Sequence, residues 1–229
     1  MKKSIYHRKI NSFVRREGRI TKSQLQALSQ LWCKYGITPA GDNILHLDSL
    51  FSEPAPLVLE IGFGMGDSLF EAAKHNPDKN FIGVEVYSPG IGALLNKIDS
   101  AELKNIKLVQ YDAVEFLRKY LPDNCIDKLA LLFPDPWPKK KHHKRRIVQN
   151  NFVELLVNKL KPQGFFHFAT DWSDYSEHVL SIMQDNPNFI NIAGDNVYVQ
   201  AALWRGETKF EKRGVKLGHE IFDLVFQKI

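Results

Sequence analysis

The sequence predicts an α/β fold in which helices cover both faces of a mostly parallel sheet. Apolar runs of strand length alternate along the chain with segments of helical periodicity, which is typical of parallel sheets. A glycine-rich turn, Gly62 to Gly66, joins the first apolar run to the first helical segment. The chain has 229 residues, of which 44% are hydrophobic and 25% charged, and this composition fits one globular domain.

Residues 1–36 are predicted to form a basic arm and a helix that packs on the core domain, residues 37–229. Residues 1–19 are basic and weakly patterned, so we expect a mobile arm there. Thr21 to Gln24 has the pattern of a capping box, which begins a helix, and Gly36 is placed to end that helix.

The core elements follow from apolar runs, periodicity and punctuation by glycine and proline. The expected strands, in chain order, are Leu57–Ile61, Phe81–Val86, Ile106–Val109, Lys128–Phe133, Phe165–Ala169 and Glu220–Gln227. The helices expected between them are Ser68–His75, Gly90–Ile98, Ala113–Tyr120, Phe152–Leu160 and Tyr175–Met183.

Composition narrows the functional class only in part. No stretch approaches the roughly 20 apolar residues of a membrane span, and no apolar segment follows the basic start as in a signal peptide, so we expect a cytoplasmic protein. Cys33 and Cys125 lack metal-ligand or redox spacing, so we expect buried free thiols and no metal site. The net charge of +5 is compatible with a polyanionic partner.

The glycine-rich turn lies where doubly wound sheets bind ligands, at the carboxyl end of the first strand. Such a turn is equally common as a plain strand-to-helix connection, but three acidic residues favour a cofactor. Glu85 closes the second strand and Asp112 follows the third; such carboxylates suit ribose hydroxyls and an adenine amino group. Glu60 would repel a pyrophosphate but suits the sulfonium and ammonium groups of S-adenosylmethionine. The alternative is that these acids are solvated strand ends or helix caps.

The fourth strand leads into a proline-rich loop, Phe133 to Pro138, which holds Asp135 near the predicted cofactor. A cationic run then follows that can neutralise phosphates of a nucleic acid, although a solvated face or a targeting signal is the alternative. Trp137 either stacks on a base or packs between the prolines. The run comprises Lys139, Lys140, Lys141, His142, His143, Lys144, Arg145 and Arg146.

Three further places are candidates for substrate contact. Asp171 follows the fifth strand, where its carboxylate could accept hydrogen bonds from a substrate. The alternative is that Asp171 is the N-cap of the next helix, and both roles could hold with Ser173 or Asp174 as the actual cap. Lys139 either holds the substrate or is a plain solvated lysine. Thr208 to Glu211 lies in a glycine-flanked stretch, for which a structural loop is the alternative.

Taken together, several motifs resemble the bacterial tRNA (guanine-N7)-methyltransferase family. The similarity extends from the sequence Phe13-Val-Arg-Arg16 almost to the C-terminus. Phe-Pro-Asp-Pro-Trp with a basic run behind it, joined to Thr-Lys-Phe-Glu, is the most specific part. The motifs are Glu60 to Gly66, Gly83 to Val86, Phe133 to Trp137, Lys144 to Arg146, Ala169 to Trp172 and Thr208 to Glu211.

The resemblance implies a Rossmann-like, S-adenosylmethionine-dependent methyltransferase fold with a mostly parallel seven-stranded sheet. It also implies methyl transfer to N7 of guanine 46, in the variable loop of tRNA, by a monomer or homodimer. Two positions depart from the family, since Tyr87 and Pro138 stand where many members carry His. Guanine N7 has a lone pair and no proton, so the reaction needs no general base and depends on positioning and electrostatics.

Residue roles are carried over position by position. Asp135 is the implied catalytic residue, and we propose that it stabilises the positive charge that develops on the guanine. The cofactor residues are Glu60, Gly62, Gly64, Glu85, Asp112 and Asp135. Substrate contacts are implied for Lys139, Asp171, Thr208, Lys209, Phe210 and Glu211. RNA contacts are implied for Lys141, His142, His143, Lys144, Arg145 and Arg146.

Three other interpretations use the same residues. One keeps the methyltransferase fold but gives it a small-molecule or ribosomal RNA substrate. Another is a basic RNA-binding module without a cofactor, which the intact Glu60, Glu85 and Asp112 disfavour. A nicotinamide-dependent dehydrogenase is disfavoured by Glu60 and by the lack of a clear hydride-transfer partner, such as a His or a Tyr-Lys pair after a strand.

Overall fold

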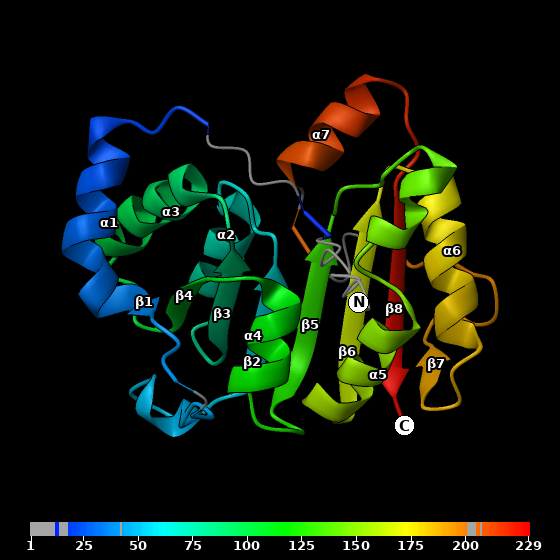
Figure 1. Cartoon of the computed structure of the whole chain (residues 1–229), viewed down its shortest axis with the longest axis horizontal. Coiled ribbons are helices and arrows are strands. Elements are labelled where there is room, and N and C mark those ends of the chain that lie inside the picture. The colour runs from blue at the N-terminus through cyan, green and yellow to red at the C-terminus, as the bar shows by residue number, and fades with distance from the viewer. Residues whose placement is uncertain (1–11, 14–17, 42, 201–204, 207) are drawn as a thin grey trace, which may run out of the picture.

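Figure 1 shows the computed structural model of the chain, which describes residues 12–13, 18–41, 43–200, 205–206 and 208–229. The mobile arm predicted for residues 1–19 lies largely outside these residues and stays a prediction. In the part of the chain that is described, no helix is both long and apolar enough to cross a membrane.

Within the described residues, eight strands form one sheet in the order β1-β4-β3-β2-β5-β6-β8-β7. All neighbours pair in parallel except β8, which runs antiparallel to both β6 and β7. The sheet is therefore mostly parallel, as predicted. Its strands are β1 (Gly36–Ile37), β2 (Leu57–Ile61), β3 (Asn80–Glu85), β4 (Ile106–Gln110), β5 (Ile126–Leu132), β6 (Leu160–Thr170), β7 (Phe189–Asn191) and β8 (Phe222–Lys228).

Helices cover both faces of the sheet, which confirms the predicted α/β class. One core cluster joins α1, α2 and α3 to β3 and β4, and a larger one joins α4, α5 and α6 to the strands from β2 to β8. The helices are α1 (Lys22–Tyr35), α2 (Asp67–His75), α3 (Ser88–Ser100), α4 (Ala113–Tyr120), α5 (Asn150–Lys159), α6 (Ser173–Gln184) and α7 (Lys209–Lys216). Short 3₁₀ helices are η1 (Leu47–Ser49) and η2 (Lys140–Arg145).

The predicted start and end of α1 are confirmed. Thr21 accepts a hydrogen bond from the Gln24 N–H while the Gln24 side chain accepts from the Thr21 N–H, and Gly36 is the C-cap. The helix packs against α3, where a Cβ on Gly92 would lie 2.6 Å from the Gln24 carbonyl oxygen. The division of the chain at residue 36 stays a prediction. Cys33 on this helix is exposed, so the prediction of two buried thiols is correct only for Cys125.

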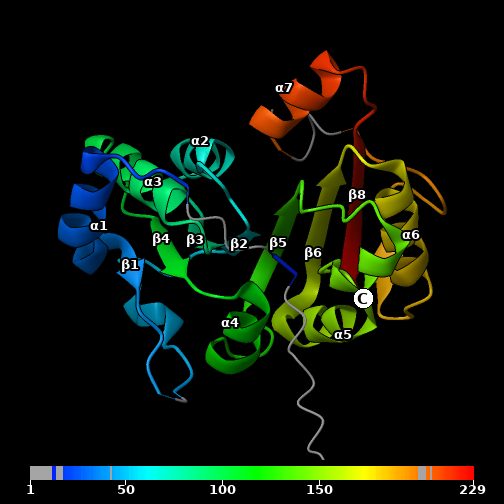
Figure 2. The same ribbon diagram turned by 45° about the horizontal axis from the view of Figure 1, so that its top comes forward.

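The direction of strand addition reverses between β2 and β5. From β2 the chain adds β3 and then β4 on one side, and it adds β5 and then β6 on the other. In such sheets ligands bind outside the carboxyl ends of the strands at this switch point. Helix α7 stands beyond the same edge, because the start of β8 that follows it pairs with the end of β6, Phe222 opposite Thr170. Figures 1 and 2 both show α7 projecting above these strand ends.

Candidate functional site

The glycine-rich turn follows β2 directly at the switch point. Gly62, Gly64 and Gly66 all have positive φ angles, of 72°, 56° and 76°, which favour glycine. A Cβ on Gly66 would lie 2.6 Å from the Leu94 side chain, so bulk is excluded there as well. At Gly62, by contrast, no described atom lies within 4 Å of an added Cβ. The turn therefore presents bare backbone to open space, as a ligand cradle requires.

Glu60 occupies the strand just before this turn and is only 7% exposed. Its side chain borders a cavity of about 60 Å³ that Lys128, His167 and Arg205 also line. Burial raises the pKa of Glu60 to about 7, assisted by the charge of Glu85 and opposed by Lys128 and Arg205. Glu60 is thus an acid that a bound cation would convert to carboxylate at neutral pH.

Glu85 is the last residue of β3, and Asp112 follows the neighbouring parallel strand β4, as predicted. Glu85 accepts hydrogen bonds from the backbone N–H groups of Gly64 (2.8 Å), Val86 (2.6 Å) and Tyr87 (3.1 Å), so it ties the glycine-rich turn to β3. Asp112 is the N-cap of α4, and its Oδ1 accepts from two N–H groups of that helix. The capping alternative is therefore realised for Asp112, and only its second oxygen remains for a ligand.

Asp135 lies exposed in the loop that leaves β5, which we call the Asp135 loop (residues 133–138). Phe133 and Trp137, at either side of it, adopt left-handed φ angles of 52° and 48°. Such a conformation costs about 1–2 kcal/mol per non-glycine residue, and the surrounding contacts must offset that cost. The Phe133 N–H donates to the Ala169 carbonyl at 2.7 Å, so the loop start is fixed to β6.

Trp137 is enclosed by the chain itself. The Arg145 guanidinium lies 3.7 Å from its ring centroid, the His142 ring stacks at 5.9 Å, and its Nε1–H donates to the Ser12 carbonyl at 3.2 Å. Of the two alternatives for Trp137, the structure favours packing, although against Arg and His rather than prolines. Desolvation and nearby cations, Lys141 first, lower the pKa of His142.

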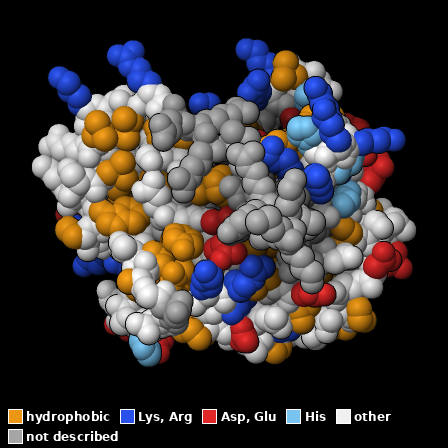
Figure 3. All heavy atoms as spheres, in the orientation of Figure 1, with side chains coloured by type: hydrophobic (Ala, Val, Ile, Leu, Met, Phe, Trp, Pro, Cys, Tyr) orange, Lys and Arg blue, Asp and Glu red, His pale blue; other side chains and the backbone are white. Residues whose placement is uncertain are grey.

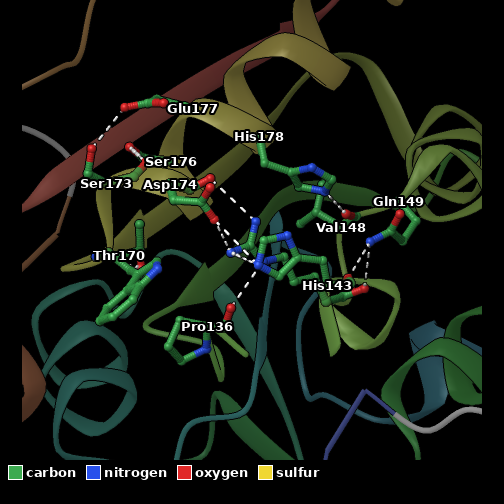
Figure 4. Close-up of polar contacts among 12 residues, drawn as sticks. Pro136, His143, Val148, Gln149, Thr170, Ser173, Asp174, Ser176, Glu177 and His178 are labelled. Carbon is green, nitrogen blue, oxygen red and sulfur yellow. Dashed lines mark hydrogen bonds and ion pairs between the residues drawn. The ribbon is translucent and has the colours of Figure 1, made fainter. Parts of the chain in front are cut away.

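The cationic run is divided by its burial. Lys139 is the N-cap of η2, and Lys139, Lys140, Lys141 and Lys144 are exposed, whereas Arg146 is only 2% exposed. Arg146 forms an ion pair with Asp174, donates from Nε to the Pro136 carbonyl at 3.0 Å and lies over the Tyr175 ring. Figure 4 shows Pro136, His143 and Asp174 converging on this point. Arg146 therefore fastens the loop to α6, and its predicted RNA contact stays a prediction.

Thr208 to Glu211 starts helix α7 rather than a loop. The Thr208 hydroxyl accepts from the Glu211 N–H at 3.0 Å, and the Glu211 carboxylate accepts from the Thr208 N–H at 3.3 Å. This capping box has the same sequence signature that begins α1, so the pattern Thr-x-x-Glu could have revealed the helix. Phe210 stacks on Phe133 with ring centroids 6.2 Å apart and lies 3.7 Å from a Cβ built on Gly64. Segments far apart in sequence thus meet above the glycine-rich turn.

Sequence reasoning missed a buried ionic network beneath this junction. Arg205 donates to both carboxylate oxygens of Asp223, at 2.8 and 2.7 Å, and pairs with Glu211. His167 lies 2.7 Å from the same Asp223, whose side chain is 1% exposed. Arg205 also stands 5.3 Å from the Phe133 ring centroid. A single guanidinium therefore joins β8, the start of α7 and the Asp135 loop.

Asp171 lies beneath the other end of α7. His219 Nδ1 is 3.2 Å from its Oδ2, and a Cβ on Gly214 would lie 3.3 Å from its Cβ. The capping alternative is wrong for Asp171, Ser173 and Asp174, because Trp172 occupies the N-cap of α6 and makes no side-chain capping bond. Asp171 therefore lies beside α7 and does not cap α6.

Comparison with known proteins identifies the family. A family model described as "Putative methyltransferase" matches residues 54–224. A tRNA (guanine-N(7)-)-methyltransferase from Alcanivorax borkumensis is 50% identical over 96% of this chain and 92% of its own length. One from Psychromonas ingrahamii is 48% identical over 100% of this chain and 93% of its own length. The chain belongs to the tRNA (guanine-N7)-methyltransferase family.

Solved structures agree with a methyltransferase fold. The 16S rRNA methyltransferase KamB superposes with a TM-score of 0.59 over 79% of this chain and 91% of its own, at 15% identity. An S-adenosylmethionine-dependent methyltransferase from Aquifex aeolicus gives 0.52 over 80% and 87%, also at 15%. At this identity the likeness shows the fold alone. Family membership thus rests on the sequence relatives, and the fold is that of methyltransferases.

Proposed function

We propose that the protein transfers the methyl group of S-adenosylmethionine to N7 of guanine 46 in tRNA. The observation that carries this proposal is the meeting of three segments at one edge of the sheet. Phe210 of α7 stacks on Phe133 of the Asp135 loop and approaches Gly64 of the glycine-rich turn. The relatives are named tRNA (guanine-N(7)-)-methyltransferases.

The described residues fit the cofactor. Open space over Gly62 admits a ligand against the backbone, and the acids offer acceptors for a cation, for ribose hydroxyls and for an adenine amino group. We assign Glu60 to the ammonium group, Glu85 to the ribose and the remaining oxygen of Asp112 to the adenine side. Gly62, Gly64 and Asp135 complete the set. When bound, S-adenosylmethionine supplies an electrophilic methyl group on a sulfonium.

Asp135 is assigned as the catalytic residue. Guanine N7 attacks with its own lone pair, so no side chain has to remove a proton. The purine gains positive charge as the bond forms, and a fixed carboxylate stabilises that charge. Since Asp135 is exposed in the free protein, the bound nucleotide itself must exclude water and strengthen this interaction.

Substrate contacts are assigned on both sides of the Asp135 loop. Asp171 keeps one oxygen for guanine N1 and N2 besides its contact with His219. The side chains of Thr208 and Glu211 are used in the capping box, so they position Lys209 and Phe210, which are exposed. Lys139 and the run Lys141, His142, His143, Lys144 and Arg145 are assigned to RNA. We infer action in the cytoplasm, as a monomer or homodimer and without a metal.

The test uses purified protein, labelled S-adenosylmethionine and unmodified tRNA, followed by identification of the methylated nucleoside. We expect 7-methylguanosine at position 46 and none when that guanine is replaced by 7-deazaguanine, which lacks N7. Asp135→Asn should lose methyl transfer while remaining folded. The matched control is Asp78→Asn, at an exposed acid before β3, and it should keep full methyl transfer. Methylation at another atom, or undiminished transfer by Asp135→Asn, would contradict the assignment.

A further inference from the structure

Helix α7 carries four cations that family resemblance leaves largely unassigned. Lys209, Lys212, Arg213 and Lys216 are all exposed, and we call them the cation stripe. Their spacing of i, i+3, i+4 and i+7 places them on one face of a helix. From the first to the last the helix rises about 10 Å. The stripe is thus a compact row of positive charge.

The opposite face of α7 is turned toward the protein. Thr208 is 6% exposed, and Gly214 is buried, with an added Cβ 3.2 Å from Ile221 and 3.3 Å from Asp171. The one acid within the helix, Glu211, also points inward and pairs with Arg205. Since Glu211 pairs with Arg205 on the inner side of α7, the charged side chains on the exposed face of this helix are all cationic.

Helix stability does not explain this arrangement. Like charges at i, i+3 and i, i+4 repel, and Lys209 lies in the first turn, where the helix dipole favours an anion. A solvated helix of eight residues would be more stable with Lys and Glu interspersed. A row of like charges on one exposed face suits a polyanionic partner.

The location of the stripe selects the polyanion. Phe133, where the Asp135 loop begins, contacts α7, and Trp137, near its end, contacts η2, which carries exposed lysines. The loop that carries Asp135 therefore contacts one cationic element near each of its ends. Figure 3 shows Lys and Arg side chains standing out over α7 and beside it. A nucleic acid that presents a base to Asp135 has phosphates on both sides of that base.

We propose that the cation stripe of α7 is a second docking surface for the phosphate backbone of the tRNA, on the other side of the target guanine from η2. This proposal rests on the proposed function and adds the contact surface. Arg213 and Lys216 bind phosphates without touching the reacting atoms. Each phosphate neutralised releases counterions, so the stripe contributes to affinity and to its salt dependence.

The test is neutralisation of the C-terminal half of the stripe, Arg213→Gln with Lys216→Gln, which preserves helix propensity and leaves Lys209 in place. The matched control is Lys74→Gln with Lys104→Gln, two exposed lysines at the opposite edge of the sheet. Binding of tRNA is measured across salt concentrations, with cofactor affinity and kcat at saturating tRNA. We expect the α7 variant to raise the tRNA Kd roughly tenfold and to flatten the salt slope by about 1.5.

Cofactor affinity and kcat should stay unchanged, and the control should behave as wild type. An α7 variant with wild-type Kd and salt slope would overturn the docking surface. So would a variant that loses kcat at unchanged Kd, because the helix would then act only on the chemical step. Failure of the proposed function is distinguished by the wild type, which would not methylate tRNA in the same assay.

Discussion

Glu60 is a side chain that folding alone disfavours. Its carboxyl group is buried at the end of β2, and the positive charges of Lys128 and Arg205 only partly oppose the rise of its pKa. Burial lowers the pKa of Lys128 in turn, to about 8. A buried ionisable group with a shifted pKa beside an open glycine turn is typical of a ligand site. The cost in stability is consistent with a group retained for binding.

Replacing Glu60 by Gln should therefore strengthen the fold and weaken cofactor binding. The folded pKa of about 7 exceeds the unfolded one, so stability from this group is complete at low pH and is lost as pH rises to about 7. At pH 8 the Gln variant should be more stable by roughly 1 to 3 kcal/mol. Its cofactor Kd should rise about tenfold.

The pH dependence of binding separates this role from simple packing. A cationic cofactor favours the Glu60 carboxylate, so wild-type affinity should increase from pH 6 to pH 8 relative to the Gln variant, in which that proton is absent. Isothermal titration calorimetry at both pH values measures the ratio of wild-type to variant affinity. Protonation of the cofactor itself affects both proteins equally and cancels in this ratio. A ratio independent of pH would show that Glu60 does not meet the cation.

At the scale of elements, the sequence predicts the strands and helices that have a periodic apolar pattern. It does not predict the short strands that form only through tertiary contacts. The strand Leu57–Ile61 and the helix Ala113–Tyr120 have the predicted bounds because their apolar patterns face a core. Strands β1 and β7 were missed because two or three residues carry no period. The predicted seven strands become eight through β1 at the sheet edge.

Site residues follow the same division. Glu85 ends one strand and Asp135 follows another, so both are placed by chain order, which the sequence shows. Arg205 and Asp223 carry no local pattern, and they become partners only because β8 inserts next to β6. A run of like charges also gives no sign of which member is buried, so Arg146 could not be told apart from Lys144. Burial is a property of the fold and not of composition.

Arg146 and Lys144 are therefore a matched pair for testing η2. Arg146→Ala removes the ion pair with Asp174, leaves the Pro136 carbonyl without its donor and opens space over Tyr175. We expect a loss of about 2 to 4 kcal/mol in the free energy of unfolding. Lys144→Ala should leave unfolding unchanged and weaken tRNA binding. Denaturant titration and tRNA binding check both, and equal stability of the two variants would contradict the assignment.

At the scale of the whole molecule, side-chain contacts connect the glycine-rich turn to helix α7. Phe210 rests on Phe133 and near Gly64, while Arg205 ties Glu211 of α7 to Asp223 of the sheet. Glu60 lies within reach of the Arg205 charge. A ligand that contacts the glycine-rich turn therefore acts on the same contacts that hold α7. Such a connection predicts that the two ligands bind interdependently.

Saturating S-adenosylhomocysteine, the unreactive demethylated cofactor, should lower the tRNA Kd about fivefold, and tRNA should lower the cofactor Kd by the same factor, as linkage demands. Phe210→Ala should reduce both factors toward one, because Phe210 is 51% exposed and its loss leaves the fold intact while removing the stack on Phe133. Fluorescence binding for tRNA and calorimetry for the cofactor measure the two sides of the cycle. Val215→Ala, at a 60% exposed position of the same helix, is the matched control and should retain the coupling. Coupling that persists in Phe210→Ala would move the connection to Arg205, whereas a factor of one in the wild type would show that turn and helix bind independently.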